Sequence, residues 1–319
     1  MSEFDLIDRY FKRPTPGAVL GVGDDAALLR VAQGMELAVS TDMLVGGTHF
    51  YLDVDPRLLG HKTLAVNLSD LAAMGAQPRW ATLSLALPQA HEDWLRAFSE
   101  GFFALAEAHG VELVGGDTTR GPLNLNVTIL GEVPQGQALR RSGAQVGDDI
   151  WVSGTLGEAA LGLAHLQSRV ELPEGARQAA LAALQQPQPR VALGLALRGV
   201  AHSAIDVSDG LLADLGHILQ ASGVAAELRY DRLPKPSFFA SADDSHDALA
   251  QECVLSGGDD YELCFTAPLA QRENIAALAE RLHLPLARVG QIVSGTGCKV
   301  RAADGHVIHT EKVGYDHFA

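Results

Sequence analysis

The sequence predicts a mixed α/β (α+β) fold arranged in two domains. The chain has 319 residues, enough for two domains of ordinary size. Hydrophobic residues make up 47% and charged residues 20%, a balance typical of a globular protein with a buried core. Segments with the periodicity of strands alternate along the chain with segments of helical periodicity, which favours this class over a helix bundle.

Three strand-like runs and one helix-like run stand out in the first half. The strand-like runs are RWATLSLALP (79–88), VELV (111–114) and LNLNVTILGEV (123–133). In the last of these, apolar residues occupy every other position, as in a strand with one buried face. The helix-like run 92–110 begins with acids, carries an apolar stripe and ends at Gly110. The run 111–114 is predicted to stop at the following Gly-Gly-Asp.

A loop-like stretch of mixed charge, residues 134–149, is the predicted boundary between domains at 1–137 and 138–319. Strand and helix patterns resume beyond it. The predicted strands are 149–154, 201–207 and 225–230, and the predicted helices are 156–168, 191–199 and 209–223. Residues 235–249 are predicted to form a surface excursion.

Charge and cysteine content limit the partners and the compartment. The formal net charge of −15 makes non-specific binding to nucleic acid or to an anionic membrane unfavourable. No apolar run approaches the length of a membrane span, and the N-terminus lacks the apolar core of a signal peptide. The 3 cysteines show no C-x-x-C spacing. A reducing, cytoplasmic location is therefore expected, without a nucleic-acid or membrane partner.

Aspartates recur beside small residues at the end of apolar segments or inside them. They are Asp24, Asp25, Asp42, Asp70, Asp117, Asp206, Asp209, Asp259 and Asp260. Carboxylates at the rim of a core are partly desolvated and repel one another, so they must be protonated, paired with bases or bound to cations. The nearest bases in these motifs are Arg120 and Arg141. Oxygen ligands without clustered His or Cys favour Mg²⁺.

Each of these residues also has a simpler interpretation. A single aspartate is more often a helix cap or a turn residue than a metal ligand. Ser40 and Thr41 can offer oxygen atoms beside Asp42, or can merely cap a strand end. Asp70 interrupts a small, apolar, helix-like run, where a buried hydrogen bond with Asn67 or Ser69 explains it as well as a metal does.

Three further residues are candidates for ligand contacts. His49 follows Asp42 closely and is either a substrate contact or a loop histidine. Arg141 is either a phosphate contact or a solvated charge, and Tyr315 packs on the core or on a ligand. The chain has no P-loop, because no glycine precedes a lysine, and no protein-kinase or G-x-S-x-G signature. The G-x-G-x-x-A match at 21–26 is discounted, since two aspartates would face the pyrophosphate.

Taken together, the motifs resemble the thiamine-monophosphate kinase family. They run in the family's order from about residue 20 to the C-terminus: GVGDDAAL, STDMLVGGTHF, LAVNLSDLAAMGAQP, LVGGDTTRGPL, RSGAQVGD, AIDVSDGLLADLGHI, LSGGDDYELCF and GYDHF. The resemblance implies the two-domain fold of the aminoimidazole ribonucleotide synthetase superfamily. It implies that the N-terminal sheet pairs across a homodimer into a barrel and that ATP binds near the interface.

The resemblance also implies roles for single residues. Several Mg²⁺ ions would be held by Asp25, Ser40, Thr41, Asp42, Asp70, Asp117, Asp206 and Asp209. Contacts with ATP would fall on Gly116, Asp117, Arg141 and Ser208, and contacts with thiamine monophosphate on His49, Asp259 and Tyr315. The family usually reads Gly-Gly-Glu-Asp where this chain has Gly257-Gly258-Asp259-Asp260, so the carboxylate at 259 is one methylene shorter.

The implied reaction is transfer of a phosphoryl group from ATP to thiamine monophosphate. No general base is expected, because the attacking phosphate oxygen is already largely ionised at neutral pH. Two alternatives remain open from the sequence. One is another ATP-dependent enzyme of the superfamily, such as an aminoimidazole ribonucleotide synthetase. The other is a structural module that holds a divalent metal without catalysis, although its ligands would be unusually dispersed.

Overall fold

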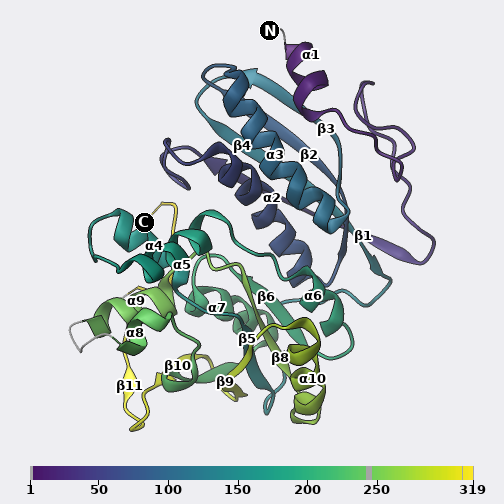
Figure 1. Ribbon diagram of the computed structural model, residues 1–319. Coiled ribbons are helices and arrows are strands. Elements are labelled where there is room, and N and C mark those ends of the chain that lie inside the picture. Colours follow the sequence, from purple (N-terminus) through teal and green to yellow (C-terminus); the bar gives the residue numbers. More distant parts are fainter. Residues whose placement is uncertain (1–2, 242–245, 311, 319) are drawn as a thin grey trace. The chain divides into compact units, whose positions relative to one another are not determined.

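A computed structural model of the chain describes residues 3–241, 246–310 and 312–318. The chain divides into two compact units: unit 1 comprises Met1–Leu71 and Ala76–Gly136, and unit 2 comprises Ala72–Gly75 and Gln137–Ala319. Figure 1 shows the helices and strands of each unit. Throughout the described ranges, no helix has both the length and the apolar character that crossing a membrane requires.

Unit 1 contains a 4-stranded sheet in the order β1-β4-β2-β3, as far as the described residues extend. Its strands are β1 (Met35–Val45), β2 (Gln77–Leu87), β3 (Glu112–Arg120) and β4 (Asn124–Pro134). β4 pairs antiparallel with both β1 and β2, and β3 runs parallel to β2. The alternating pattern of 123–133 is confirmed, because Leu125, Val127 and Ile129 are fully buried on one face of β4.

Two helices, α2 (Pro56–Ala73) and α3 (Glu92–His109), lie side by side over one face of this sheet (Figure 1). They approach so closely that a Cβ at Gly60 would lie 2.0 Å from the Phe98 carbonyl oxygen. The predicted helix 92–110 is confirmed, with Gly110 in the left-handed conformation at its end. α1 (Glu3–Leu6) and a π-helical turn, η1 (Ile7–Phe11), precede the sheet.

The strand predicted to stop at Gly115-Gly116-Asp117 does not stop there. β3 continues to Arg120, and its register with β2 shifts opposite Ala81 and Thr82. The shift skips Val114, and just beyond it the strands come so close that a Cβ on Gly116 would lie only 1.9 Å from the Leu83 carbonyl oxygen. The prediction was wrong because the two glycines lie in paired strand beside a bulge rather than in a turn.

Unit 2 contains a 7-stranded sheet, again among the described residues, in the order β11-β10-β7-β9-β5-β8-β6. Its strands are β5 (Asp149–Ser153), β6 (Ser203–Val207), β7 (Ala225–Arg229), β8 (Glu262–Ala267), β9 (Leu286–Val293), β10 (Gly297–Arg301) and β11 (Val307–Ile308). Within the described ranges, β7 and β10 are the only parallel pair of this sheet, and its other neighbouring strands are antiparallel. The predicted strands 149–154, 201–207 and 225–230 correspond to β5, β6 and β7.

The helices of unit 2 are α4 (Glu158–Leu166), α5 (Glu174–Gln185), α6 (Val191–Leu197), α7 (Leu211–Ser222), α8 (Ser237–Ser241), α9 (Asp247–Ser256) and α10 (Arg272–Leu282). The described residues of this unit also form the short 3₁₀ turns η2 (Tyr230–Arg232) and η4 (Leu269–Gln271). The predicted helices 156–168, 191–199 and 209–223 are confirmed by α4, α6 and α7. Buried leucines and Ile218 of α7 pack against Ile205 and Val207 of β6, which fixes the loop between this strand and this helix.

The segment 235–249 is not merely a surface excursion. It contains α8 and the first residues of α9, and the partly buried Phe238 and Phe239 pack against the apolar cluster that includes Leu161 and Leu172. Two adjacent aromatic residues among polar ones gave little periodicity, so the sequence pattern underestimated how much apolar area this segment covers. Residues 242–245 of this segment lie outside the described residues.

Candidate functional site

In unit 1, three of the predicted metal ligands lie together between β1 and α2. Strand alternation places Ser40 and Asp42 on the face of β1 toward the helices, where their partners in β4 are buried. Ser40 Oγ donates to Asp70 Oδ2 at 2.5 Å, which joins β1 to the C-terminal half of α2. Ser40, a residue distant in sequence, is thus a side-chain partner of Asp70.

Asn67 is a residue of this group that the sequence interpretation considered only as a partner of Asp70. Its Oδ1 accepts the backbone N–H of Asp42 at 3.1 Å, and its Nδ2 donates to the Thr63 carbonyl oxygen at 3.1 Å. The side chain is fully buried, so both of its bonds are shielded from water. Asn67 therefore fixes the backbone from which the Asp42 carboxylate extends.

Thr41 and Asp117 are not part of this group. Thr41 lies on the opposite face of β1, where its Oγ1 donates to the Val127 carbonyl oxygen at 2.9 Å and accepts from Asn126 and Thr128. Asp117 is exposed on β3, and both β4 and β2 stand between β3 and β1. Three strand spacings amount to about 14 Å, so the Asp42 and Asp117 backbones are well separated across the sheet.

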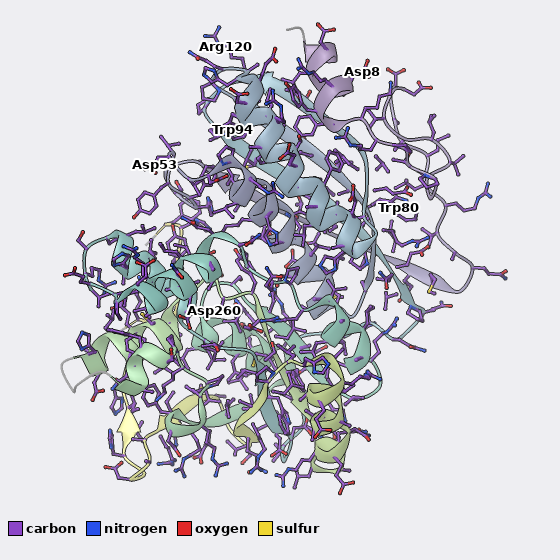
Figure 2. All side chains as sticks on the ribbon, in the orientation of Figure 1. Asp8, Asp53, Trp80, Trp94, Arg120 and Asp260 are labelled. Atoms are coloured by element: carbon purple, nitrogen blue, oxygen red, sulfur yellow. The ribbon has the colours of Figure 1, made fainter. Side chains whose placement is uncertain are left out.

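The remaining predicted residues of unit 1 occupy loops. Asp25 is exposed in the segment before β1, and its backbone N–H donates to Asp24 Oδ1 at 2.9 Å. His49 lies in the turn after β1, where its Nδ1 accepts the Val45 backbone N–H at 3.0 Å. A neutral His49 ring therefore carries its proton on Nε2. Arg120 is the last residue of β3 (Figure 2).

In unit 2, three segments distant in sequence converge through backbone hydrogen bonds. The Asp259 N–H donates to the Ser208 carbonyl oxygen at 2.8 Å, and the Tyr315 N–H donates to the Asp209 carbonyl oxygen at 3.0 Å. A Cβ on Gly258 would lie 2.4 Å from the Ser208 oxygen, so glycine is needed for this approach. The predicted residues Ser208, Asp209, Asp259 and Tyr315 are thus neighbours. Asp206 is buried in β6, just before this loop.

A buried carboxylate that the sequence interpretation missed supports the β6–α7 loop. Asp214, in the first turn of α7, accepts the N–H groups of Ser208, Asp209 and Gly210 at 3.0, 3.1 and 3.1 Å through one oxygen, Oδ2. Burial raises the pKa of Asp214 to about 6, and these N–H groups act in the opposite direction. The sequence does show this acid, five residues after Asp209 in DGLLAD. Its position there is that of an ordinary helix residue, so it did not stand out.

Two residues of the loop before β8 have an unusual backbone conformation. Asp259 and Tyr261 have φ angles of 69° and 50°, a region that costs energy for residues other than glycine. The Tyr261 hydroxyl donates to Asp259 Oδ1 at 3.0 Å, and the Tyr261 side chain is itself buried. The carboxylate at 259, shorter than the family's usual glutamate, is therefore held by a rigid neighbour.

Asp260 turns the other way, toward the start of α4. Its Oδ2 accepts the Gly157 N–H at 2.7 Å, whereas its Oδ1 is buried without a hydrogen-bond partner in the described part of the chain. Burial raises the pKa of Asp260 well above its ordinary value, and the charge on Glu262 adds to the effect. Asp260 thus supports the loop through its bond to the start of α4.

An arginine that the sequence analysis did not name pairs with Glu262, the first residue of β8. Arg190 Nε donates to Glu262 Oε2 at 2.7 Å, and its Nη2 bonds to the other carboxylate oxygen. The Ser153 hydroxyl also donates to Glu262 Oε2, at 2.5 Å. Arg190 is 72 residues from Glu262 in sequence, so this ion pair is a tertiary contact.

Arg141 is exposed and lies apart from the converging segments of unit 2. Its carbonyl oxygen is bonded to Ser222 at the C-terminal end of α7, whereas Ser208 and Asp209 lie at the N-terminal end. The 12 residues of α7 span about 18 Å. Among the described residues, no three side chains of His, Cys, Asp or Glu gather in a way that could hold a metal ion.

Comparisons with known proteins identify the family. The chain matches the family model AIR synthase related protein, N-terminal domain, over residues 23–133, and the C-terminal domain model over residues 145–303. It is 47% identical over 321 residues to thiamine-monophosphate kinase of Salmonella typhimurium, a match that covers 99% of this chain and 98% of the relative. The relation therefore extends through both domains.

Solved structures agree with the sequence relatives. Thiamine-monophosphate kinase of Stenotrophomonas maltophilia K279a aligns with a TM-score of 0.87 and 51% identity, covering 97% of this chain and 98% of the other. A structure of AaThiL complexed with AMPPCP and TMP aligns with a TM-score of 0.74 and 29% identity, covering 98% and 96% of the two chains. The two-domain fold predicted from the motifs is confirmed, and the chain belongs to the thiamine-monophosphate kinase family.

Proposed function

We propose that this chain transfers the terminal phosphoryl group of ATP to thiamine monophosphate, which yields ADP and thiamine diphosphate. The observation that carries the proposal is 47% identity, along 99% of the chain, to a thiamine-monophosphate kinase. The complex of a related kinase with AMPPCP and TMP supports a triphosphate and a thiamine phosphate as the two substrates. The 3 free cysteines agree with the cytoplasmic location proposed from the sequence.

The proposal assigns several Mg²⁺ ions to oxygen atoms of both predicted domains, 1–137 and 138–319. The ligands would be Asp25, Ser40, Thr41, Asp42, Asp70, Asp117, Asp206 and Asp209. The hydroxyl and carboxylate groups of Ser40 and Asp70, 2.5 Å apart, fit a hard cation by their chemistry. Because Mg²⁺ usually keeps several waters, one or two carboxylates for each ion are enough.

Binding of the two substrates would use separate sets of residues. The nucleotide would contact Gly116, Asp117, Arg141 and Ser208, and thiamine monophosphate would contact His49, Asp259 and Tyr315. The Asp259 carboxylate and the Tyr315 ring suit the cationic thiazolium. Tyr261 contributes indirectly, because its hydroxyl group fixes the orientation of the Asp259 carboxylate.

The chemical obstacle is electrostatic. The nucleophile is a phosphate oxygen, largely ionised at neutral pH, so the chain needs no general base. Each pair of unit charges about 4 Å apart repels by roughly 4 kcal/mol at an effective dielectric constant of 20. Bound Mg²⁺ supplies positive charge against this repulsion. The side chains would bind the two phosphate groups and hold the attacking oxygen in line with the leaving oxygen.

The proposal includes a homodimer formed through unit 1. β1 is an edge strand, and the apolar side chains of Leu37, Val39 and Met43 are 40%, 57% and 51% exposed on its face away from the helices. An edge strand with such a face is a ready surface for pairing with a second copy. Light scattering should give about twice the 33.7 kDa of one chain, and a monomer at micromolar concentration would contradict this part of the proposal.

The direct test incubates the purified chain with ATP, Mg²⁺ and thiamine monophosphate and measures thiamine diphosphate by chromatography. Product is expected only with all three components, and chelation by EDTA should abolish its formation. Thiamine and aminoimidazole precursors serve as competing substrates, because turnover of a precursor alone would favour the aminoimidazole ribonucleotide synthetase alternative. Stabilisation by metal alone, with no effect of nucleotide on the melting temperature, would favour the structural module.

A further inference from the structure

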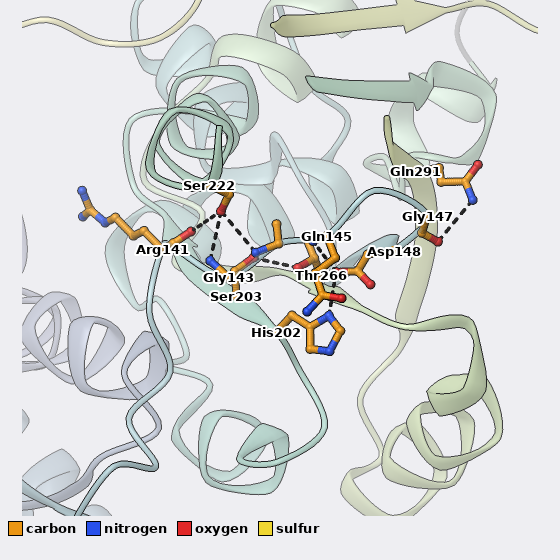
Figure 3. Close-up of polar contacts among 11 residues, drawn as sticks. Arg141, Gly143, Gln145, Gly147, Asp148, His202, Ser203, Ser222, Thr266 and Gln291 are labelled. Carbon is orange, nitrogen blue, oxygen red and sulfur yellow. Dashed lines mark hydrogen bonds and ion pairs between the residues drawn. The ribbon is translucent and has the colours of Figure 1, made fainter. Parts of the chain in front are cut away.

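The side chain of Ser222 contacts the backbone of the segment that carries Arg141. Its Oγ accepts the N–H groups of Gly143 and Ala144 at 3.1 and 3.2 Å, and donates to the Arg141 carbonyl oxygen at 3.3 Å (Figure 3). A serine hydroxyl has one donor and two acceptor sites, so these bonds use its full capacity. The two segments are separated by about 80 positions in sequence, so this is a tertiary contact.

The flanks of the same segment are held by other groups. Before Arg141, the Arg140 carbonyl oxygen accepts the Ala204 N–H at 2.9 Å. After it, Asp148 Oδ2 accepts the Gln145 N–H at 2.9 Å and lies 2.8 Å from His202 Nδ1. With both flanks anchored, the hydroxyl of Ser222 fixes the short piece between them. The guanidinium of Arg141 extends away from this bonded backbone (Figure 3).

Helix α7 connects this contact with the other nucleotide contact proposed for unit 2. Asp214 at its N-terminal end holds the N–H group of Ser208, and Ser222 at its C-terminal end holds the backbone of Arg141. Both hydrogen bonds arise from one helix whose apolar face is buried in the core. The helix therefore sets the spacing between Ser208 and Arg141.

We propose that Ser222 is a positioning residue for ATP: it holds the backbone at Arg141–Ala144 so that the Arg141 guanidinium meets the nucleotide. This inference rests on the proposed function and adds to it a residue that acts through Arg141. A merely structural Ser222 would close a turn and affect stability alone. A positioning Ser222 affects ATP binding, and only while Arg141 is present.

The test compares Ser222→Ala with Ser222→Thr, which keeps the hydroxyl, in the full-length chain. Ser222→Ala should raise the KM for ATP about tenfold, the effect of losing a small hydrogen-bond group, with kcat changed less than about twofold. Ser222→Thr should stay within about threefold of the parent. Because Ser222 is only partly buried at a helix end, its truncation leaves the core intact. A melting temperature close to that of the parent checks this.

A double-mutant cycle with Arg141→Ala decides whether Ser222 acts through Arg141. Ser222→Ala should add less than about twofold to the KM of an Arg141→Ala variant. An unchanged KM in Ser222→Ala, or an equal rise in both backgrounds, overturns the inference. Calorimetric binding of AMPPCP separates the two proposals. A parent that binds AMPPCP but makes no thiamine diphosphate refutes the proposed function alone, and a parent that binds no nucleotide refutes both.

Discussion

Replacement of Asp42 by asparagine is expected to lower kcat/KM for phosphoryl transfer by more than about a hundredfold without unfolding the chain. Loss of a group that hydrogen-bonds to a metal ligand typically lowers metal affinity or activity about 10–100-fold. Loss of the charge on a ligand itself should lower activity more. The fold should persist because asparagine keeps the shape of the side chain, and the bond to Asn67 uses only the backbone N–H of residue 42. Initial rates at several Mg²⁺ concentrations measure the effect.

Asp93→Asn is the matched control, because this carboxylate on α3 is 95% exposed and its ion pair with Arg96 lies at the surface. An exposed pair of this kind contributes little to stability, so the control should retain the parent's rate and melting temperature. An Asp42→Asn variant that turns over as fast as the control would remove Asp42 from the metal ligands.

Truncation of Asp214 to alanine should reduce both stability and activity. The variant leaves the N–H groups of Ser208, Asp209 and Gly210 without their acceptor. An unsatisfied buried donor costs about 1–3 kcal/mol, and water can reach part of this loop, so a total loss of about 3 kcal/mol is expected. The loop that carries Ser208 and Asp209 would lose its fixed geometry, so kcat/KM should fall by about 10–100-fold. Urea unfolding and steady-state rates measure the two effects.

Asp214→Asn distinguishes the loss of an acceptor from the loss of a charge. Its amide oxygen can accept hydrogen bonds where Asp214 Oδ2 does. Burial disfavours the charged carboxylate and raises the pKa of Asp214 to about 6, and the neutral amide avoids this cost. Its free energy of unfolding should therefore lie nearer to the parent's than to that of Asp214→Ala. Equal destabilisation of the two variants would show that the hydrogen bonds to the loop are not the cause.

Local patterns were sufficient to predict the main elements. The stripe and caps of 92–110 predicted α3, and the alternation in 123–133 predicted β4, because helices and strands bury one face with fixed periods. The prediction failed where a feature depends on contact between two segments that are separate in the sequence. Gly115-Gly116 marks a bulge only when β2 is beside it, and the aromatic pair at 238–239 is seen to be partly buried only when α4 and α5 are near.

The candidate site, too, has features that the sequence predicted and features that only the folded structure shows. The order and content of its motifs were enough to identify the family and to propose the ligands, because both inferences depend on residue types. Some contacts around those ligands come from distant segments, such as Asn67 for Asp42 and Arg190 for Glu262, and Asp214 reaches back six residues to Ser208. No local pattern marks such partners, because each is an ordinary helix or loop residue until the chain folds.

The sequence by itself determined the fold class, the family and the residue types available for catalysis. The tertiary structure decided which of these residues are neighbours: it joins Ser40 to Asp70 and brings Ser208, Asp209, Asp259 and Tyr315 together, while Asp117 stays across the sheet from Asp42. The physical reason is that periodicity depends on neighbours along the chain. A hydrogen bond between distant segments depends instead on strand order, register and the path of each loop.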